Sequence, residues 1–507
     1  MVPLTVYLPG GILLFWISRE ISHRWSLRRK AKAFGCESIT NYPHLDPIGG
    51  LDLSVQIWRE FHRGELSEGM RRRHEKFGPT FSTNSLGQDC IYTIDPENIR
   101  AVTTDNFDCY GKSAWVEEAA KHVGNGILMS DGENWKRSRA VLKPLFARTA
   151  LDEPTLVEPH LQDLVQVIRG NNGQPFDFQV LAARFTLDIV TDFLFGKSTQ
   201  SLLGGKAAED ARHFLGLVKD FEPPSGTFIA VGALAWLELL PSYRRLLHVV
   251  DGMKAFFRSQ LDMIISDPGL HSQSAAPSCF RMMESDGVGV GQIQAELQNI
   301  FFASFDTTTA LLANIIGILS QRQDIQQQLR AEISYLNGNP PTKQDLGGLS
   351  FLRFVLLEAL RLYSPVVSHS RQATRDTTLP RGGGSDGLGQ IFVAAGATIV
   401  WSTYALNRSQ RYYGQTWAEF KPERWKTLQP TSNRFFMPFG SGPRSCMGQQ
   451  MAQTEISYMI VRILQEFPVI ASQDLRPFKE AKAVSFYNTY DTDANTGVYA
   501  EQAEDPN

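Results

Sequence analysis

Cysteine is scarce in this chain, with five residues among 507, and the formal net charge of −3 leaves no large surplus of either sign. The cysteines are odd in number, scattered and without Cys-x-x-Cys spacing: Cys36, Cys90, Cys109, Cys279 and Cys446. This pattern argues against a disulfide framework and a zinc site, and it fits a reducing compartment. The charge gives no indication of a nucleic-acid partner, and no internal repeat is visible.

The N-terminus lacks charge from residue 1 to residue 18, and a series of basic residues follows between Arg19 and Lys32. A helix of 18 residues rises about 27 Å, close to the hydrocarbon thickness of a bilayer. We therefore expect a membrane anchor at residues 1–18 that spans or dips into the membrane, with the basic side in the cytosol. A cleaved signal peptide is the alternative, but no basic region precedes the apolar run.

Residues 19–47 are basic, contain proline and are predicted to form a linker. From residue 48 to residue 507 no clean boundary is visible, and most segments have helical spacing. We expect a mainly α body with a small β region around residues 382–401. A second apolar stretch at 228–240 is either a core helix or a contact with the membrane surface. The small, polar stretch at 268–290 predicts a surface loop.

One cysteine has neighbours that suit a haem ligand, in the sequence Phe439-Gly-Ser-Gly442-Pro-Arg444-Ser-Cys446-Met-Gly448. A thiolate pushes electron density onto haem iron and favours O–O cleavage. The glycines let the backbone approach a flat macrocycle, and backbone N–H groups can bond to the sulfur. Arg444 suits a bidentate pair with a haem carboxylate. The alternative is a buried structural cysteine.

This pattern resembles the haem loop of the cytochromes P-450, the haem-thiolate monooxygenases, whose signature is Phe-x-x-Gly-x-Arg-x-Cys-x-Gly. Every fixed position is met, by Phe439, Gly442, Arg444, Cys446 and Gly448. The resemblance implies that these residues bind haem b (iron protoporphyrin IX), with Cys446 as the iron ligand. It also implies the cytochrome P-450 fold, with residues 48–507 as a single catalytic domain, and it extends from about Gly35 to about Pro477.

A long, mostly apolar helix without proline is expected over residues 291–320, with the sequence Ala-Ser-Phe-Asp-Thr-Thr at 303–308. Polar groups inside an apolar helix are costly unless they are bonded, and the hydroxyls can bond to carbonyls four residues earlier. The segment resembles the family's oxygen-binding motif, Ala/Gly-Gly-x-Asp/Glu-Thr, which implies that Asp306 and Thr307 relay protons. Ser304 departs from the usual glycine, and the width of the oxygen groove is therefore open.

Glu358 and Arg361 stand three residues apart on a helix with apolar flanks, which predicts a buried ion pair. Such a pair adds little net stability, but the loss of one partner is severe. The family has this Glu-x-x-Arg pair, completed by an arginine of a downstream Pro-Glu-Arg segment, here Arg424. The resemblance therefore implies a structural role for these three residues in holding the haem loop.

Trp135 and Arg139 stand four residues apart on another predicted helix, where an ordinary surface face is the alternative. In the family, a Trp-x-x-x-Arg pair contacts the haem propionates, and Arg371 occupies a similar propionate-facing place. His369, two residues before Arg371, is expected to be a polar residue near the pocket and not a metal ligand.

Four longer stretches resemble the fungal alkane- and fatty-acid-hydroxylating branch of the family: 47–53, 126–135, 373–384 and 446–450. This implies insertion of one oxygen atom from O2 into an aliphatic C–H bond of a hydrophobic substrate such as a fatty acid or alkane. Related fungal enzymes also tailor polyketide or terpenoid secondary metabolites, which is the alternative. The pocket candidates, for which core packing is equally open, are Phe302, Phe305, Val366, Val367 and Phe486.

The family implies electrons from NADPH through a membrane-bound cytochrome P-450 reductase, and a place in the endoplasmic reticulum membrane with the catalytic domain facing the cytosol. Arg434 and Lys426 are candidates for contact with an acidic reductase face. A haem-thiolate isomerase or dehydratase that needs no O2 activation is a further alternative. A non-catalytic haem-based sensor or carrier is another, and the pair Asp306 and Thr307 argues against both.

Overall fold

The computed structural model describes residues 4–46, 49–231, 241–266, 278–430, 434–472, 479–480, 488–489 and 497–501. Most of these residues are helical, in α1(Leu4–Ala33), α2(Leu51–Arg63), α3(Leu66–Phe77), α4(Pro96–Arg100), α5(Ala114–Val123), α6(Gly132–Gly170), α7(Phe178–Phe195), α8(Lys206–Val231), α9(Pro241–Ser266), α10(Cys279–Ser285), α11(Val290–Gln321), α12(Gln323–Ile333), α13(Lys343–Gly348), α14(Ser350–Leu362), α15(Thr403–Asn407), α16(Gln410–Tyr413) and α17(Gln449–Glu466). The expectation of a mainly α body with a small β region is confirmed.

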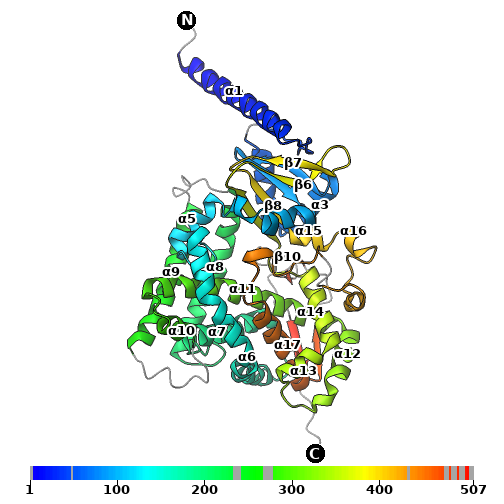
Figure 1. Cartoon of the computed structure of the whole chain (residues 1–507). Helices are drawn as coiled ribbons and strands as arrows, with labels where there is room; N and C mark the ends of the chain where they lie inside the picture. The colour runs from blue at the N-terminus through cyan, green and yellow to red at the C-terminus, as the bar shows by residue number, and fades with distance from the viewer. Residues whose placement is uncertain are drawn as a thin grey trace, which may run out of the picture.

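The β region lies on one side of the body, between α1 and the helices (Figure 1). Its main sheet has the order β1-β2-β8-β5-β3, built from β1(Thr80–Ser85), β2(Gln88–Thr93), β8(Thr398–Ser402), β5(Ser368–Ala373) and β3(Tyr110–Gly111). Strands β1 and β2 join through Leu86 and Gly87, whose φ angles of 53° and 81° suit a two-residue hairpin turn. A second hairpin pairs β6(Thr377–Gly383) with β7(Gly389–Val393). The short strands β4(Phe176–Asp177), β9(Val469–Ser472), β10(Lys479–Glu480), β11(Asn488–Thr489) and β12(Gly497–Glu501) form two further small sheets.

Helix α1 extends away from the body, and its C-terminal end lies beside the β6–β7 hairpin (Figure 1). Lys30 Nζ lies 2.8 Å from Asp376 Oδ2, and the Phe34 ring lies 5.2 Å from that of Phe392. The helix continues past residue 18, so the linker expected from residue 19 is corrected: residues 19–33 contain neither proline nor glycine and continue the helix. Beyond the helix, the chain bonds to the hairpin, where Glu37 N donates to the carbonyl of Gln390 at 2.8 Å.

Helix α11 runs through the middle of the body (Figure 1) and joins two hydrophobic cores. Its N-terminal half, from Ile293 to Phe305, packs with α6–α10, and its C-terminal half, from Leu311 to Leu319, packs with α6, α7, α12, α14 and α17. Within the described part of the chain, α11 alone has the length and hydropathy of a membrane-spanning helix. Since most of it is buried between these cores, it is a core helix.

Two further predictions concern the polar stretch 268–290 and the apolar stretch 228–240. The surface loop expected at 268–290 is corrected in its second half, where α10 is capped by the hydroxyl of Ser278. Its side chains Cys279, Phe280 and Met283 are buried. The apolar residues of this stretch therefore form a packed helix, although many of their neighbours are polar. Residues 267–277 and most of the apolar stretch at 228–240, from residue 232 onward, lie outside the described residues.

A buried carboxylate on α14 ties together the chain that leads to the haem-loop sequence. Glu358, which has no exposed surface, pairs with Arg361 through two bonds of 2.8 and 2.9 Å and with Arg424 Nε at 2.8 Å. It also accepts from Trp425 Nε1 at 3.0 Å and from the backbone N–H of Lys421 at 2.8 Å. The predicted Glu-x-x-Arg pair is therefore formed and completed by the predicted arginine.

The guanidinium groups of this cluster use their remaining donors on backbone carbonyls. Arg361 donates to the carbonyls of Asn407, Trp417 and Glu419 at 2.7–3.0 Å. Arg424 donates to the carbonyls of Thr416 and Glu419. These charge-assisted bonds hold the segment 407–425 against α14.

Replacing Glu358 by Gln should strongly destabilise the protein, because Arg361 and Arg424 would stay buried without a counter-charge, at a cost of about 3–5 kcal/mol. The measurement is the rate at which the protein loses its haem absorption at a fixed elevated temperature. Glu284→Gln is the matched control, since Glu284 pairs with Arg281 at the same spacing on an exposed helix face. Equal rates for both variants would contradict the structural role of Glu358.

Candidate active site

The loop around Cys446 folds back on itself just before α17. Cys446 N donates to the carbonyl of Phe439 at 2.9 Å, and Ser445 N donates to that of Gly442 at 3.0 Å. Gly442 has a φ of 71°, and a Cβ there would collide with the carbonyl oxygen of Thr103. Glycine is therefore required at this position by both backbone conformation and space.

The Cys446 side chain is accessible, although protein surrounds much of it. Partial burial raises the pKa of the Cys446 thiol, while a hydrogen bond from the Gly448 N–H and the positive charge of Arg139 act in the opposite direction. Both of these groups favour the thiolate, which is the form that ligates iron. Arg139 Nη1 also donates to the carbonyl of Ser445 at 3.2 Å, which links α6 to the loop.

Arg444 projects from the same loop toward the N-terminus of α6. Its guanidinium pairs with Asp131, donates to the carbonyl of Ser130 at 3.2 Å and lies 4.3 Å from the centre of the Trp135 ring. The Arg139 guanidinium lies 5.8 Å from the same ring. The structure therefore brings together three residues that sequence reasoning assigned to the haem: Arg444, Trp135 and Arg139.

Two more cations join this group from the β region. Arg371, on β5, has its pKa lowered to about 10 by burial and by the neighbouring charge of Arg444. Lys112, which follows β3, has its pKa lowered to about 7 by burial and by Arg371 and Arg444. Burial also lowers the pKa of Arg444, although Asp131 opposes this shift.

These residues fit a haem. Lys112, Arg371 and Arg444 lie near the carboxylate of Asp131, and Arg139 lies beside Arg444, so in the described part of the site positive charge is in excess. Two haem carboxylates would balance that excess, because an opposite charge favours the charged form of each cation. A thiol on a glycine loop beside such a cluster is the set of groups that a thiolate-ligated haem requires.

His369 lies near these cations but is not one of them. Its pKa is lowered to about 4 by burial and by the charges of Arg371 and Lys112. Its ring stacks on that of Trp401 at 5.3 Å. The ring is therefore neutral at physiological pH, and its place near the substrate pocket stays a prediction.

The central part of α11 carries Ala303, which is exposed, and Thr307 one turn later, which is half-buried. Thr307 Oγ1 donates to the carbonyl of Ala303 at 2.7 Å, and Ser304 Oγ donates to that of Ile300 at 2.8 Å. Both hydroxyls thus bond to carbonyls four residues earlier, as predicted from the cost of leaving a polar group unbonded inside an apolar helix. The hydroxyl of Ser304 is bonded to its own helix, while Asp306 beside Thr307 is half-buried.

The residues predicted to line the substrate pocket do not all lie on the face of α11 that carries Ala303 and Thr307. Phe305 is buried in the core and stacks on Phe301 at 5.2 Å, so its assignment to the pocket is corrected: it stands two residues, about 200°, from Ala303. Phe302 is only partly buried beside the core. Val366 is 38% exposed, and Val367 is half-buried. Phe486 lies outside the described residues.

Sequence reasoning missed Lys112 and Asp131. Asp131 had a usable signal, because an aspartate directly before Gly-Glu is a typical first residue of a helix, and its carboxylate does accept from Gly132 N at 2.9 Å. Its second oxygen accepts from the backbone N–H of Lys112 at 2.6 Å. Nothing in the sequence near Lys112 indicated its place, because strand pairing between β3 and β5 decides it.

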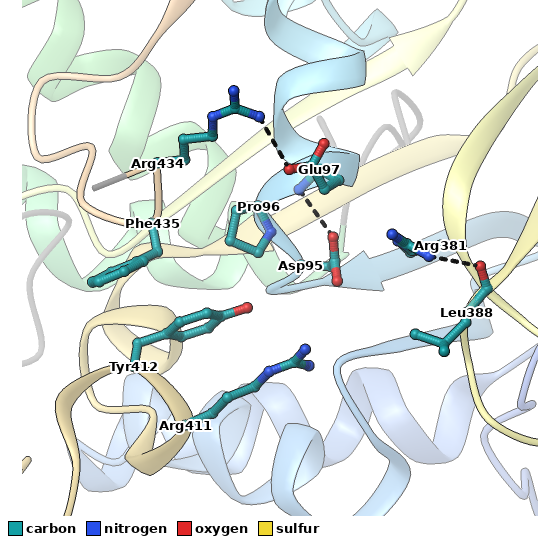
Figure 2. Close-up of a pocket in the computed structure, with 9 residues that line it drawn as sticks. All are labelled: Asp95, Pro96, Glu97, Arg381, Leu388, Arg411, Tyr412, Arg434 and Phe435. Atoms are coloured by element: carbon teal, nitrogen blue, oxygen red, sulfur yellow. Dashed lines mark hydrogen bonds and ion pairs between the residues drawn. The ribbon is translucent and has the colours of Figure 1, made fainter. Parts of the chain in front are cut away.

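Figure 2 shows a separate surface pocket of about 270 Å³, where Arg434 lies 3.5 Å from Glu97 and the Tyr412 and Phe435 rings stack at 4.8 Å. It is lined by Asp95, Pro96, Glu97, Arg381, Leu388, Arg411, Tyr412, Arg434 and Phe435. None of these belongs to the group around Cys446, so this pocket is not the place for a haem.

Comparison with known proteins agrees with this site. A family model described as Cytochrome P450 matches residues 53–489. Cytochrome P450 monooxygenase FPY7 of Fusarium mangiferae is 36% identical over 96% of this chain and 94% of its own length. Cytochrome P450 monooxygenase himC of Aspergillus japonicus is 34% identical over 88% and 81%, and Cytochrome P450 52A5 of Candida maltosa is 35% identical over 77% of each chain.

The chain therefore belongs to the cytochrome P450 family. It is a cytochrome P450 monooxygenase, and the family implies a haem cofactor and electrons from a redox partner. The fold expected for the body is accordingly confirmed.

The depressed pKa of Lys112 gives a pH prediction for the haem-free protein. Between pH 7 and 10.5 the folded state binds fewer protons at this group than the unfolded state, so stability rises with pH by up to about 1.4 kcal/mol per unit. Lys112→Met should remove much of this slope and, by removing a cation, should speed haem release. Denaturant unfolding at pH 7 and pH 9, with Lys426→Met as the exposed control, tests the slope; an unchanged slope in the Lys112 variant would contradict it.

Proposed function

We propose that this monooxygenase inserts one oxygen atom from O2 into an aliphatic C–H bond of a hydrophobic substrate, with a fatty acid or alkane as the first candidate. The observation that supports this type of reaction is the accessible Cys446 thiol, which lies on a glycine-containing loop beside the cations Arg139 and Arg444. The similarity to Cytochrome P450 52A5 supports the substrate class only through the resemblance to the alkane- and fatty-acid-hydroxylating branch.

In this proposal Cys446 ligates the iron of haem b, which supplies the activation of molecular oxygen when bound. Arg444, Arg371 and Lys112 hold the haem carboxylates, and Trp135 fixes the Arg444 guanidinium by lying beneath it. Phe439, Gly442 and Gly448 shape the loop, and Arg139 links it to α6.

Asp306 and Thr307 handle protons on the α11 face. Thr307 Oγ1 donates to Ala303 O in the structure, and its lone pairs stay available to accept a hydrogen bond from a solvent molecule or from protonated Asp306. Phe302, Val366, Val367 and Phe486 are proposed to limit how a chain lies against this face, because positioning decides which carbon reacts.

Replacing Thr307 by Ala should uncouple the enzyme, since a positioned proton donor is worth about 10²-fold or more. NADPH should still be consumed, but product per NADPH should fall and peroxide should rise. Thr309→Ala is the control, because Thr309 makes the same bond to a carbonyl four residues earlier but faces the core. Unchanged coupling in the Thr307 variant would refute its role in proton delivery.

Fatty acids of graded chain length should shift the haem spin state of the purified enzyme to high spin, with saturation at a preferred length. Such a shift means that the acid enters the pocket. If no length gives a shift while the reduced CO complex still has thiolate absorption, the enzyme is intact and the fatty-acid proposal is wrong.

The second candidate is a tailoring oxidation of a fungal secondary metabolite, such as a polyketide or terpenoid. The observation that favours it is that the chain is as similar to monooxygenases outside the 52A group as to those within it: FPY7 and himC are 36% and 34% identical, and Cytochrome P450 52A5 is 35% identical. The same titration separates the two candidates, since a tailoring enzyme should ignore simple fatty acids.

We further propose that α1 anchors the enzyme in the endoplasmic reticulum membrane, with the catalytic domain 48–507 in the cytosol. The uncharged part of this helix, from Leu4 to Ser18, rises about 22 Å, so it would enter the hydrocarbon core while the basic end stays outside it. NADPH would supply electrons through a membrane-bound cytochrome P450 reductase, whose acidic face would meet exposed cations such as Arg434 and Lys426.

A further inference from the structure

The surface pocket of Figure 2 is built where four segments distant in sequence meet. They are the residues that begin α4, the β6–β7 hairpin, helix α16 and the chain ahead of the cysteine loop. Its apolar part consists of Pro96, Leu388 and the stacked rings of Tyr412 and Phe435. Its charged part consists of three arginines and two carboxylates. The pocket therefore has one positive charge in excess.

Both carboxylates of the pocket already have partners. Asp95 Oδ1 caps α4, where it accepts from two backbone N–H groups at 2.9 and 3.3 Å. Glu97 Oε1 lies 3.5 Å from Arg434 Nη1. Among the described residues, no carboxylate forms an ion pair with the two other arginines, Arg381 and Arg411. These two guanidinium groups therefore keep donors for a ligand in the pocket.

Arg381 is fixed beside α4 through its backbone. The buried side chain of Asn98 donates to the carbonyl of Arg381 at 3.0 Å and accepts from its N–H at 2.9 Å. Arg381 Nη1 also donates to the carbonyl of Leu388 across the hairpin at 3.1 Å. This bond uses one N–H of the guanidinium, and the others remain for a ligand.

Helix α16 is also fixed, and it brings Arg411 and Tyr412 to the pocket. The next residue, Tyr413, is buried, and the guanidinium of Arg361 lies 4.8 Å from the centre of its ring. Tyr413 also packs edge-on against Phe435 at 5.4 Å. Because these walls are in place before a ligand binds, ordering them costs little binding free energy.

We propose that this pocket is an accessory binding site for a small ligand that has one carboxylate on a flat apolar body. The carboxylate would lie between the guanidinium groups of Arg381 and Arg411, which extend from different elements toward the same space (Figure 2). Bonds of this charge-assisted kind are among the strong hydrogen bonds of proteins. The flat body would lie against Tyr412 and Leu388.

One acidic group matches the single positive charge in excess, whereas a second would lie near Asp95 without a further cation. The inference is independent of the substrate proposed above, because the pocket shares no residue with the haem site.

Binding of 2-naphthoate to the haem-loaded enzyme tests this site, with the uncharged 2-naphthamide as the matched ligand. Titration calorimetry at low salt should show that naphthoate binds more tightly by about ten-fold or more, because only the carboxylate accepts charge-assisted bonds. The haem absorption should stay unchanged during the titration, since the ligand binds outside the haem site.

Replacing Arg381 or Arg411 by Ala should weaken naphthoate binding by about ten-fold each and leave naphthamide binding unchanged. Arg353→Ala is the control. The exposed Arg353 lies 5.9 Å from the ring of the residue that follows it on α14, and Arg411 lies 5.7 Å from the ring of Tyr412. The control should bind naphthoate as the parent enzyme does.

Tighter binding of naphthoate than of naphthamide, weakened in both pocket variants and not in Arg353→Ala, supports the proposal. Equal affinities for the two ligands, or no binding of naphthoate, overturn it. A naphthoate affinity that neither pocket variant changes also overturns it, and a shift of the haem absorption would then place the ligand in the substrate site. Should Arg381→Ala fail to fold, Arg411→Ala decides alone, because Arg411 is exposed.

Discussion

The site depends first on a carboxylate that has no contact with solvent. Glu358 binds two arginines, an indole and a backbone N–H, and the arginines in turn bind carbonyls along the irregular segment 407–425. That segment has little regular secondary structure, yet it leads to the loop that carries Cys446. Buried charges of this kind contribute little to net stability, because desolvation offsets their attraction. What they contribute here is one defined path for the chain, since any other path would leave a charge unpaired.

An excess of positive charge shapes the other side of the site. Lys112, Arg371 and Arg444 come from three different parts of the chain and share one protein carboxylate, Asp131. Their mutual repulsion and burial disfavour the charged forms, as the low pKa values of Lys112 and Arg371 indicate. The protein tolerates this because a bound dianionic cofactor would relieve it. The binding free energy of haem and the folding of this region are therefore coupled.

Helix α11 contributes both to the hydrophobic cores and to the candidate active site. One face belongs to two hydrophobic cores, which fix the helix in place, while another face carries Ala303 and Thr307. Near its N-terminus, Asn299 and Glu296 bind the residues before α6, the helix that bears Trp135. Helix α11 thus fixes the position of Thr307 and of the residues before α6 at the same time, because a close-packed helix moves as one rigid unit.

Local patterns in the sequence determined much of this protein: the cysteine loop with its glycines, the Glu-x-x-Arg pair, the long apolar helix and the mainly α fold all follow from spacing and residue type. Phe305 is buried in the core, which the sequence had left open, because it lies about 200° around the helix from Ala303 and only packing decides which face is buried. The places of Lys112, Asp131 and Asn299 in the site were not predicted from the sequence, because they come from contacts between segments distant in sequence. The sequence thus determined which chemistry this chain carries, whereas the tertiary structure decided which charges meet and which chain segments border the site, because contacts between segments distant in sequence leave no local pattern.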